Sequence, residues 1–210
     1  MTNLILLSGG LDSTSCLLKL LDETDEEIQA VYIDVGNNTE KSWCEREAIH
    51  QILNEVEKKF IRPNLSICKV ELAGSCSNLG QPPVWGLLAS FVADSCSADK
   101  IYLGYTKGDT ILGENYPRTV NKYWELVWKL ISVKKRPKLV FPIERQTKRH
   151  SLKLIRQFEK KHDMELVRHL WTCEFPVRHH SQHFSGYKAC GICIPCTKGI
   201  QSGFIDPSAL

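Results

Sequence analysis

The string Ser8-Gly9-Gly10-Leu11-Asp12-Ser13 has the residue types and spacing of a phosphate site. It follows a short apolar run at residues 4–7 and precedes a segment with helical spacing, so free backbone N–H groups at a helix start can hold an anion. The glycines let the backbone close around a phosphate, and the serine hydroxyls can bind its oxygens. Asp12 can orient the loop or help to hold Mg²⁺. The string predicts a phosphate loop (residues 8–13), although a tight turn with a helix cap has the same local pattern.

A second set of residues that can do chemistry is formed by cysteines near the C-terminus. Cys190, Cys193 and Cys196 recur at steps of three residues, and Cys173 lies upstream. Thiolates at this spacing can share one tetrahedral Zn²⁺ in a closed, structural site. The rival ligands for the place of Cys173 are three histidines of the intervening segment, His179, His180 and His183. Redox use of a Cys-x-x-Cys motif is the other alternative.

Alternating strands and helices must position these two sets. Apolar runs predict strands at residues 4–7, 30–33, 66–72, 101–103 and 139–141. Helical spacing predicts helices from residue 13, over 48–56, 85–93 and 119–131, and from a Thr147 cap to residue 158. This order indicates an α/β fold with a doubly wound, mainly parallel sheet, whose ligands bind at the carboxyl ends of the strands. We expect a nucleotide-binding domain over residues 1–165 and a small zinc module over residues 166–210, packed on it.

The composition is that of an ordinary globular chain. It is 42% hydrophobic and 24% charged over 210 residues, and its formal net charge of +3 is too small to indicate nucleic-acid binding by itself. The longest apolar stretch, residues 84–93, is far shorter than the roughly 20 residues of a membrane helix. Residues 1–7 lack the basic region of a signal peptide. We therefore expect a cytoplasmic protein whose nine cysteines are thiols or metal ligands.

The phosphate loop resembles the pyrophosphate-binding loop of the PP-loop ATP pyrophosphatase superfamily, whose members adenylylate a substrate oxygen with ATP and release pyrophosphate. The resemblance implies that residues 8–13 bind ATP, and that Asp34 and Gly36, which end the second expected strand, lie where the adenosine is seated. It also implies that Lys148 meets the ATP phosphates. Asp12 and Lys148 are thus the expected catalytic residues, with ATP and Mg²⁺ as cofactors.

The loop and the cysteine pattern together make the chain similar to the QueC family of 7-cyano-7-deazaguanine synthases over nearly its whole length. The motifs Asp34-x-Gly36, Tyr116-Pro117 and Trp171-Thr172-Cys173 belong to the same resemblance. It implies that ATP activates 7-carboxy-7-deazaguanine, that ammonia forms the amide, that the amide is dehydrated to the nitrile, and that Zn²⁺ is structural. Expected partners are this small molecule and ammonia. We also expect a homodimer. We expect no membrane partner and no nucleic-acid partner.

The sequence departs from the family where substrate should bind. Asn37-Asn38-Thr39 stands in place of a Gln and a basic pair, Leu79-Gly80-Gln81-Pro82 in place of Pro-Gly-Arg-Asn, and Arg118-Thr119 in place of Asp-Cys. An amine on a partner protein is therefore an alternative acceptor, as in QueC-like proteins of anti-phage operons. We expect Asp109, Glu114 and Tyr116 to bind the substrate, since Asp109 or Glu114 can accept two N–H bonds from a guanine-like edge.

Two other function classes stay open. A tRNA-modifying PP-loop enzyme, such as a thiolase, would use the basic run at residues 134–138. A partner protein that binds a nucleotide without catalysis would fit the altered substrate motifs. The intact phosphate loop argues against this second class, because a dead site need not retain Asp12.

Overall fold

The structure is a computed structural model that describes residues 2–36, 38–60, 65–71, 81–111, 114–131, 136–180 and 185–209. Within these ranges, the side chains of residues 65–71, 81–83, 110, 111, 114–116, 180, 185 and 209 lie outside the description.

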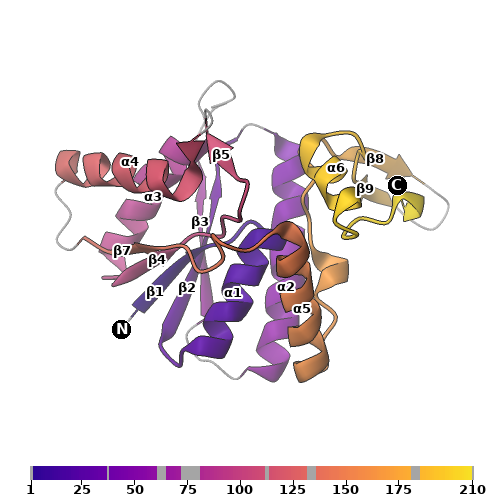
Figure 1. Ribbon diagram of the computed structural model, residues 1–210, viewed down its shortest axis with the longest axis horizontal. Helices are drawn as coiled ribbons and strands as arrows, with labels where there is room; N and C mark the ends of the chain where they lie inside the picture. The colour runs from indigo at the N-terminus through magenta and orange to yellow at the C-terminus, as the bar shows by residue number, and fades with distance from the viewer. Residues whose placement is uncertain are drawn as a thin grey trace.

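Five parallel strands form the central sheet (Figure 1). Their spatial order is β3 (Leu65–Glu71), β2 (Glu27–Asp34), β1 (Thr2–Leu6), β4 (Lys100–Tyr102) and β7 (Lys138–Val140). The chain moves outward from β1 to β3 and then crosses to β4 on the other side of β1. This reversal opens a crevice at the carboxyl ends of β1 and β4, where open α/β sheets bind their ligands. The predicted doubly wound sheet is confirmed.

Helices cover both faces of the sheet (Figure 1). One face packs against α1 (Leu11–Glu23), α2 (Thr39–Lys59) and α5 (Lys148–His162), and the other against α3 (Gln81–Ser95) and α4 (Tyr116–Leu130). Successive strand residues point to opposite faces, so Leu4 packs with α3 and α4 while Ile5 packs with α1, α2 and α5. Both residues are fully buried. A strand buried on both faces favours apolar residues, which is why residues 4–7 read as a continuous apolar run.

Polar side chains fix the starts of two helices. The Asn38 side chain accepts a hydrogen bond from the backbone N–H of Lys41 and caps α2, and Thr147 accepts one from the N–H of His150 and caps α5. The predicted Thr147 cap is thus present. Because Lys148 directly follows this cap, its position at the first turn of α5 is set by the cap.

The C-terminal part of the chain lies beside the start of α2 (Figure 1). It contains two short helices, η1 (Val167–His169) and η2 (Pro207–Ala209), the antiparallel pair β8 (Val177–His180) and β9 (Ser185–Lys188), and α6 (Ile194–Gln201). The strands β8 and β9 lie in the segment between Cys173 and Cys190, for which the sequence predicted no strand. A second hairpin, β5 (Thr110–Ile111) with β6 (Glu114–Asn115), precedes α4, which begins three residues earlier than expected. Among the described residues, no helix combines the length and apolar character that crossing a membrane requires.

Candidate active site and metal centre

A cavity of about 470 Å³ lies at the carboxyl ends of the strands. Its wall brings together most of the residues predicted for ATP, namely Ser8, Gly10, Leu11, Asp12, Ser13, Asp34 and Lys148, and also Asp109. The rest of the wall includes residues of α2 and α6. Gly9 and Gly36, which are also predicted for ATP, do not line the cavity. The side chains of Glu114 and Tyr116 lie outside the described residues, so their predicted substrate role stays a prediction.

The phosphate loop is closed by its own hydroxyls and by packing against α2. The Ser13 hydroxyl oxygen lies 3.2 Å from the backbone nitrogen of Ser8, whose N–H donates to it, and 3.1 Å from the Ser8 hydroxyl. Gly9 has a φ of 71°, and a Cβ there would lie 2.8 Å from the Cβ of Ala48. Only glycine meets both demands. Gly10, at the N-cap of α1, supplies no side-chain acceptor, so the first N–H groups of α1 are open to an anion.

Three charged side chains, one of them Asp12 of the loop itself, lie together in the cavity wall. The Lys148 Nζ contacts Asp12 Oδ2 and lies 3.7 Å from Asp109 Oδ1. Burial and the Lys198 ammonium lower the pKa of Lys148 to about 8, whereas the two carboxylates favour its charged form. Asp12 Oδ1 is buried and has no hydrogen-bond partner among the described residues. A buried carboxylate oxygen in a cavity is normally satisfied by a ligand, a water or a cation, and Mg²⁺ prefers such oxygens.

Two of the residues predicted to bind ATP or substrate, Asp34 and Asp109, already accept hydrogen bonds from neighbouring residues. Asp34 Oδ1 accepts from the Gly36 N–H at 3.0 Å and from the Ser42 hydroxyl at 2.7 Å, which closes the turn between β2 and α2. Asp109 Oδ2 accepts from the N–H and the hydroxyl of Thr106 at 2.8 and 3.0 Å. Both carboxylates therefore shape the cavity, with part of their acceptor capacity already used.

Sequence reasoning missed a further charged group in the same wall, the Lys41 cluster (Lys41, Glu45 and Glu174). Lys41 Nζ lies 2.5 Å from Glu174 Oε2 and 3.7 Å from Glu45 Oε1, and the Tyr32 hydroxyl donates to Glu45. All four residues line the cavity. The available signal was the i,i+4 spacing of Lys41 and Glu45, which on its own indicates a solvated helix face.

The four cysteines near the C-terminus come together as one group. Their Sγ atoms lie within 4.8 Å of one another. Cys173 is part of this group, whereas His179 is not; the side chain of His180 and all of His183 lie outside the described residues. The N–H of Cys190 donates to Cys173 Sγ at 3.2 Å, and that of Cys193 to Cys190 Sγ at 3.4 Å. These thiols form a closed set of sulfur ligands that can hold one metal ion.

The cluster contains thiols with opposite pKa shifts. Burial acts to raise the pKa of Cys190, but N–H groups of Cys193 and Ile192 outweigh it and lower that pKa to about 7. Burial raises the pKa of Cys173 to about 11. Because a metal binds the thiolate, ion binding must displace the Cys173 proton, so the affinity for metal rises with pH.

No protein-family model matches the chain. A full-length relative does: 7-cyano-7-deazaguanine synthase of Methanocaldococcus jannaschii is 24% identical over 225 residues, which cover 94% of this chain and 92% of that protein. The chain resembles this synthase. The alignment spans nearly the whole of both proteins.

One solved structure supports the fold. The U34-tRNA thiolase NcsA of Methanococcus maripaludis, solved with its [4Fe-4S] cluster, superposes with a TM-score of 0.50 at 15% identity over 77% of this chain. The chain spans 58% of that thiolase's length. A predicted subunit of a tRNA methyltransferase from Methanocaldococcus jannaschii gives a TM-score of 0.40 at 10% identity over 82% of this chain and 92% of that one, too low a similarity to support an argument. The predicted α/β fold with a mainly parallel sheet is confirmed.

Proposed function

We propose that this protein is an ATP-dependent enzyme that adenylylates the carboxylate of 7-carboxy-7-deazaguanine and converts it to the amide and then the nitrile. The observation that carries the proposal is the shared cavity, in which the phosphate loop, the unpartnered Asp12 Oδ1 and Lys148 line one space. The similarity to 7-cyano-7-deazaguanine synthase over 94% of the chain supports the choice of substrate.

ATP would be held by its phosphates at the loop. The open N–H groups at the start of α1 and the hydroxyls of Ser8 and Ser13 suit phosphate oxygens, and Asp12 Oδ1 suits a Mg²⁺ ion bound to them. Lys148 places a cation where pyrophosphate develops negative charge as it leaves. Phosphate oxygens beside the ammonium raise its pKa from about 8, so bound ATP keeps Lys148 charged.

The proposed reaction has two activations. A substrate carboxylate oxygen attacks the α-phosphorus of ATP, the bond to the β-phosphate oxygen breaks, and pyrophosphate leaves. Ammonia attacks the acyl carbon, loses a proton and expels AMP, which leaves the amide. A second ATP adenylylates the amide oxygen, and loss of AMP and two protons gives the nitrile. An amine on a partner protein would stop the sequence at the amide, and this is the alternative acceptor in a defence role.

The cysteine cluster fits a structural Zn²⁺. A tetrahedral site with Zn–S bonds of about 2.3 Å places its sulfurs roughly 3.8 Å apart, which agrees with Sγ atoms that all lie within 4.8 Å of one another. Four sulfurs from Cys173, Cys190, Cys193 and Cys196 complete the shell, so the ion has no open position for chemistry. When bound, it would hold the C-terminal segment in place. Metal analysis of the purified protein distinguishes zinc from iron.

The test is incubation of the protein with Mg-ATP and 7-carboxy-7-deazaguanine, with and without ammonia. AMP, pyrophosphate and the base are followed by mass spectrometry. Amide or nitrile formation would establish the small-molecule synthase. AMP formation with no ammonia-dependent product would support activation with a different amine as acceptor. Absence of ATP turnover with this base would refute the proposed substrate.

A further inference from the structure

The cavity contains a charged group for which the proposed ATP chemistry has no use, the Lys41 cluster. The Lys41 side chain is only 8% exposed, and its ammonium lies between the carboxylates of Glu174 and Glu45. Burial acts against the charged form of Lys41, but the two carboxylates outweigh it and raise the pKa of Lys41. The lysine is thus a fixed cation in the wall, next to acceptor oxygens.

The two carboxylates differ in what they can offer a ligand. The Glu45 side chain is 17% exposed and already accepts a hydrogen bond of 2.9 Å from the Tyr32 hydroxyl. The Glu174 side chain is 39% exposed, and its contact with Lys41 is made through Oε2. A carboxylate has about four acceptor positions, so Glu174 retains capacity at Oε1 and at a second lone pair of Oε2. Glu174 is therefore the carboxylate that can reach a ligand.

Lys41 can also take part in binding. An ammonium has three N–H donors, and one of them is donated to Glu174 Oε2 at 2.5 Å. Glu45 Oε1, at 3.7 Å, lies beyond hydrogen-bond distance and pairs with Lys41 by charge. A remaining N–H can donate to a ligand oxygen. Lys41 and Glu174 side by side then present one donor followed by two acceptors.

This order matches the edge of a guanine-type base, which presents an exocyclic oxygen, a ring N–H and an exocyclic amino group. An adenine edge presents one amino donor and one ring-nitrogen acceptor, so it satisfies fewer of these positions. Reading a base by hydrogen bonds to its Watson–Crick edge is the usual means of recognition in a closed pocket. Two parallel N–H bonds to one carboxylate add both strength and geometric selectivity.

We propose that Lys41 and Glu174 are the specificity-determining residues for the base: Lys41 donates to the exocyclic oxygen, and Glu174 accepts from the ring N–H and the amino group. The assignment rests on the proposed function, because it takes the deazaguanine substrate as the ligand. It replaces Asp109 in this role, since Asp109 Oδ2 is bound by Thr106 and its Oδ1 lies 3.7 Å from Lys148.

The test measures binding by calorimetry of three probes to the full chain. They are 7-carboxy-7-deazaguanine, the analogue that lacks the 2-amino group, and α,β-methylene-ATP with Mg²⁺. For Glu174→Gln we expect binding of the first probe to weaken roughly 10- to 100-fold, because the bidentate acceptor is lost. The preference for that probe over the analogue should disappear, and nucleotide binding should stay unchanged. The matched control is Glu40→Gln, which removes an exposed charge of α2 outside the cavity wall and should change none of the three.

Glu174 adjoins Cys173, so metal content and thermal unfolding are measured on each variant. Glu174→Asp keeps the charge and withdraws it from the base, and we expect an intermediate loss for the first probe. Equal weakening of both bases by either variant would overturn the assignment, as would a loss confined to the nucleotide, which would make the Lys41 cluster an adenine site. A wild-type protein that binds the nucleotide but neither base would instead overturn the proposed substrate.

Discussion

The backbone N–H of Trp171 donates a hydrogen bond of 2.9 Å to the carbonyl oxygen of Gly9. This bond joins the segment that carries Cys173 directly to the phosphate loop. The Trp171 indole N–H donates to the Cys173 carbonyl at 3.1 Å, and a Cβ on Gly10 would lie 3.2 Å from the Trp171 carbonyl oxygen. The cysteine cluster and the phosphate loop are therefore mechanically connected through one tryptophan.

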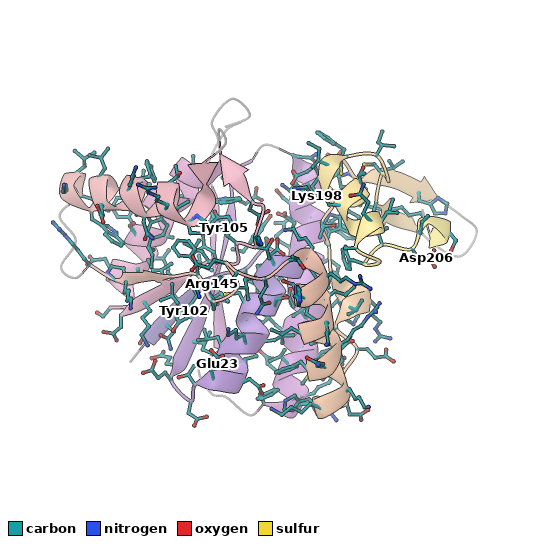
Figure 2. All side chains as sticks on the ribbon, in the orientation of Figure 1. Glu23, Tyr102, Tyr105, Arg145, Lys198 and Asp206 are labelled. Atoms are coloured by element: carbon teal, nitrogen blue, oxygen red, sulfur yellow. The ribbon has the colours of Figure 1, made fainter. Side chains whose placement is uncertain are left out.

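Removal of the metal should weaken nucleotide binding. The C-terminal segment contributes Trp171 and Lys198 to the cavity wall, and Lys198 lies on α6, whose N-cap is Cys193 (Figure 2). Without an ion the ligand loops are no longer tied together, so these wall residues lose their fixed positions. We expect Cys190→Ser, or chelation of the wild type, to weaken α,β-methylene-ATP binding roughly tenfold or more, measured by calorimetry beside metal analysis. Cys96→Ser, outside the cluster, is the control. Unchanged affinity in the metal-free protein would show that the phosphate loop is independent of the cluster.

Lys148 should be needed for turnover rather than for base binding. Its ammonium contacts Asp12 beside the phosphate loop, where the leaving pyrophosphate needs a cation. We expect Lys148→Ala to lower base-dependent pyrophosphate release by roughly 100-fold or more, by analogy with loss of one preorganised charge donor. Asp12→Asn should act in the same direction, with retained binding of 7-carboxy-7-deazaguanine in both. Lys160→Ala on the exposed side of α5 is the matched control. Normal turnover in Lys148→Ala would remove Lys148 from the proposed mechanism.

Gly9→Ala should destabilise the fold more than a glycine substitution at a similar φ in open space. Gly9 and Gly203 have φ values of 71° and 72°, but only at Gly9 would the new Cβ meet another atom, the Ala48 Cβ at 2.8 Å. We expect Gly203→Ala to cost about 1 kcal/mol for the left-handed backbone, and Gly9→Ala to cost about 2–4 kcal/mol because the clash adds to it. Urea unfolding of the two variants measures the difference. Equal costs would mean that α2 yields freely to the loop.

Glu45 should make stability depend on pH. Burial raises the pKa of Glu45 from 4.5 to about 7, against the opposing effects of Lys41 and of the Tyr32 hydroxyl, while Glu174 and Asp34 add to the rise. The folded state then binds more protons than the unfolded state between these values, so the free energy of unfolding falls as pH rises from about 4.5 to 7, by up to roughly 3 kcal/mol. Glu45→Gln should flatten this fall. Urea unfolding at pH 5 and pH 8 measures it, and parallel profiles for variant and wild type would contradict the assignment.

Local patterns were sufficient for most of the architecture. The apolar runs identified β1, β2, β3, β4 and β7 because strands in the middle of an α/β sheet are rich in apolar residues. Helical spacing identified the five long helices for the equivalent reason, since each buries one stripe of side chains. The hairpins β5–β6 and β8–β9 were missed because strands of two to four residues are too short to show a period.

In the candidate site, too, the local motifs could be predicted from the sequence and the long-range contacts could not. The sequence by itself determined the loop at residues 8–13 and the steps of three residues between Cys190, Cys193 and Cys196, because each is a contiguous motif whose geometry follows from the local backbone. Only the tertiary structure decided that Glu174 meets Lys41 across 133 positions, that Asp109 is tied to Thr106, and that Trp171 reaches Gly9. The physical reason is that such contacts depend on how the intervening elements pack. The sheet order and the position of the C-terminal segment bury Lys41 and make an ordinary helix-surface pair part of the cavity wall.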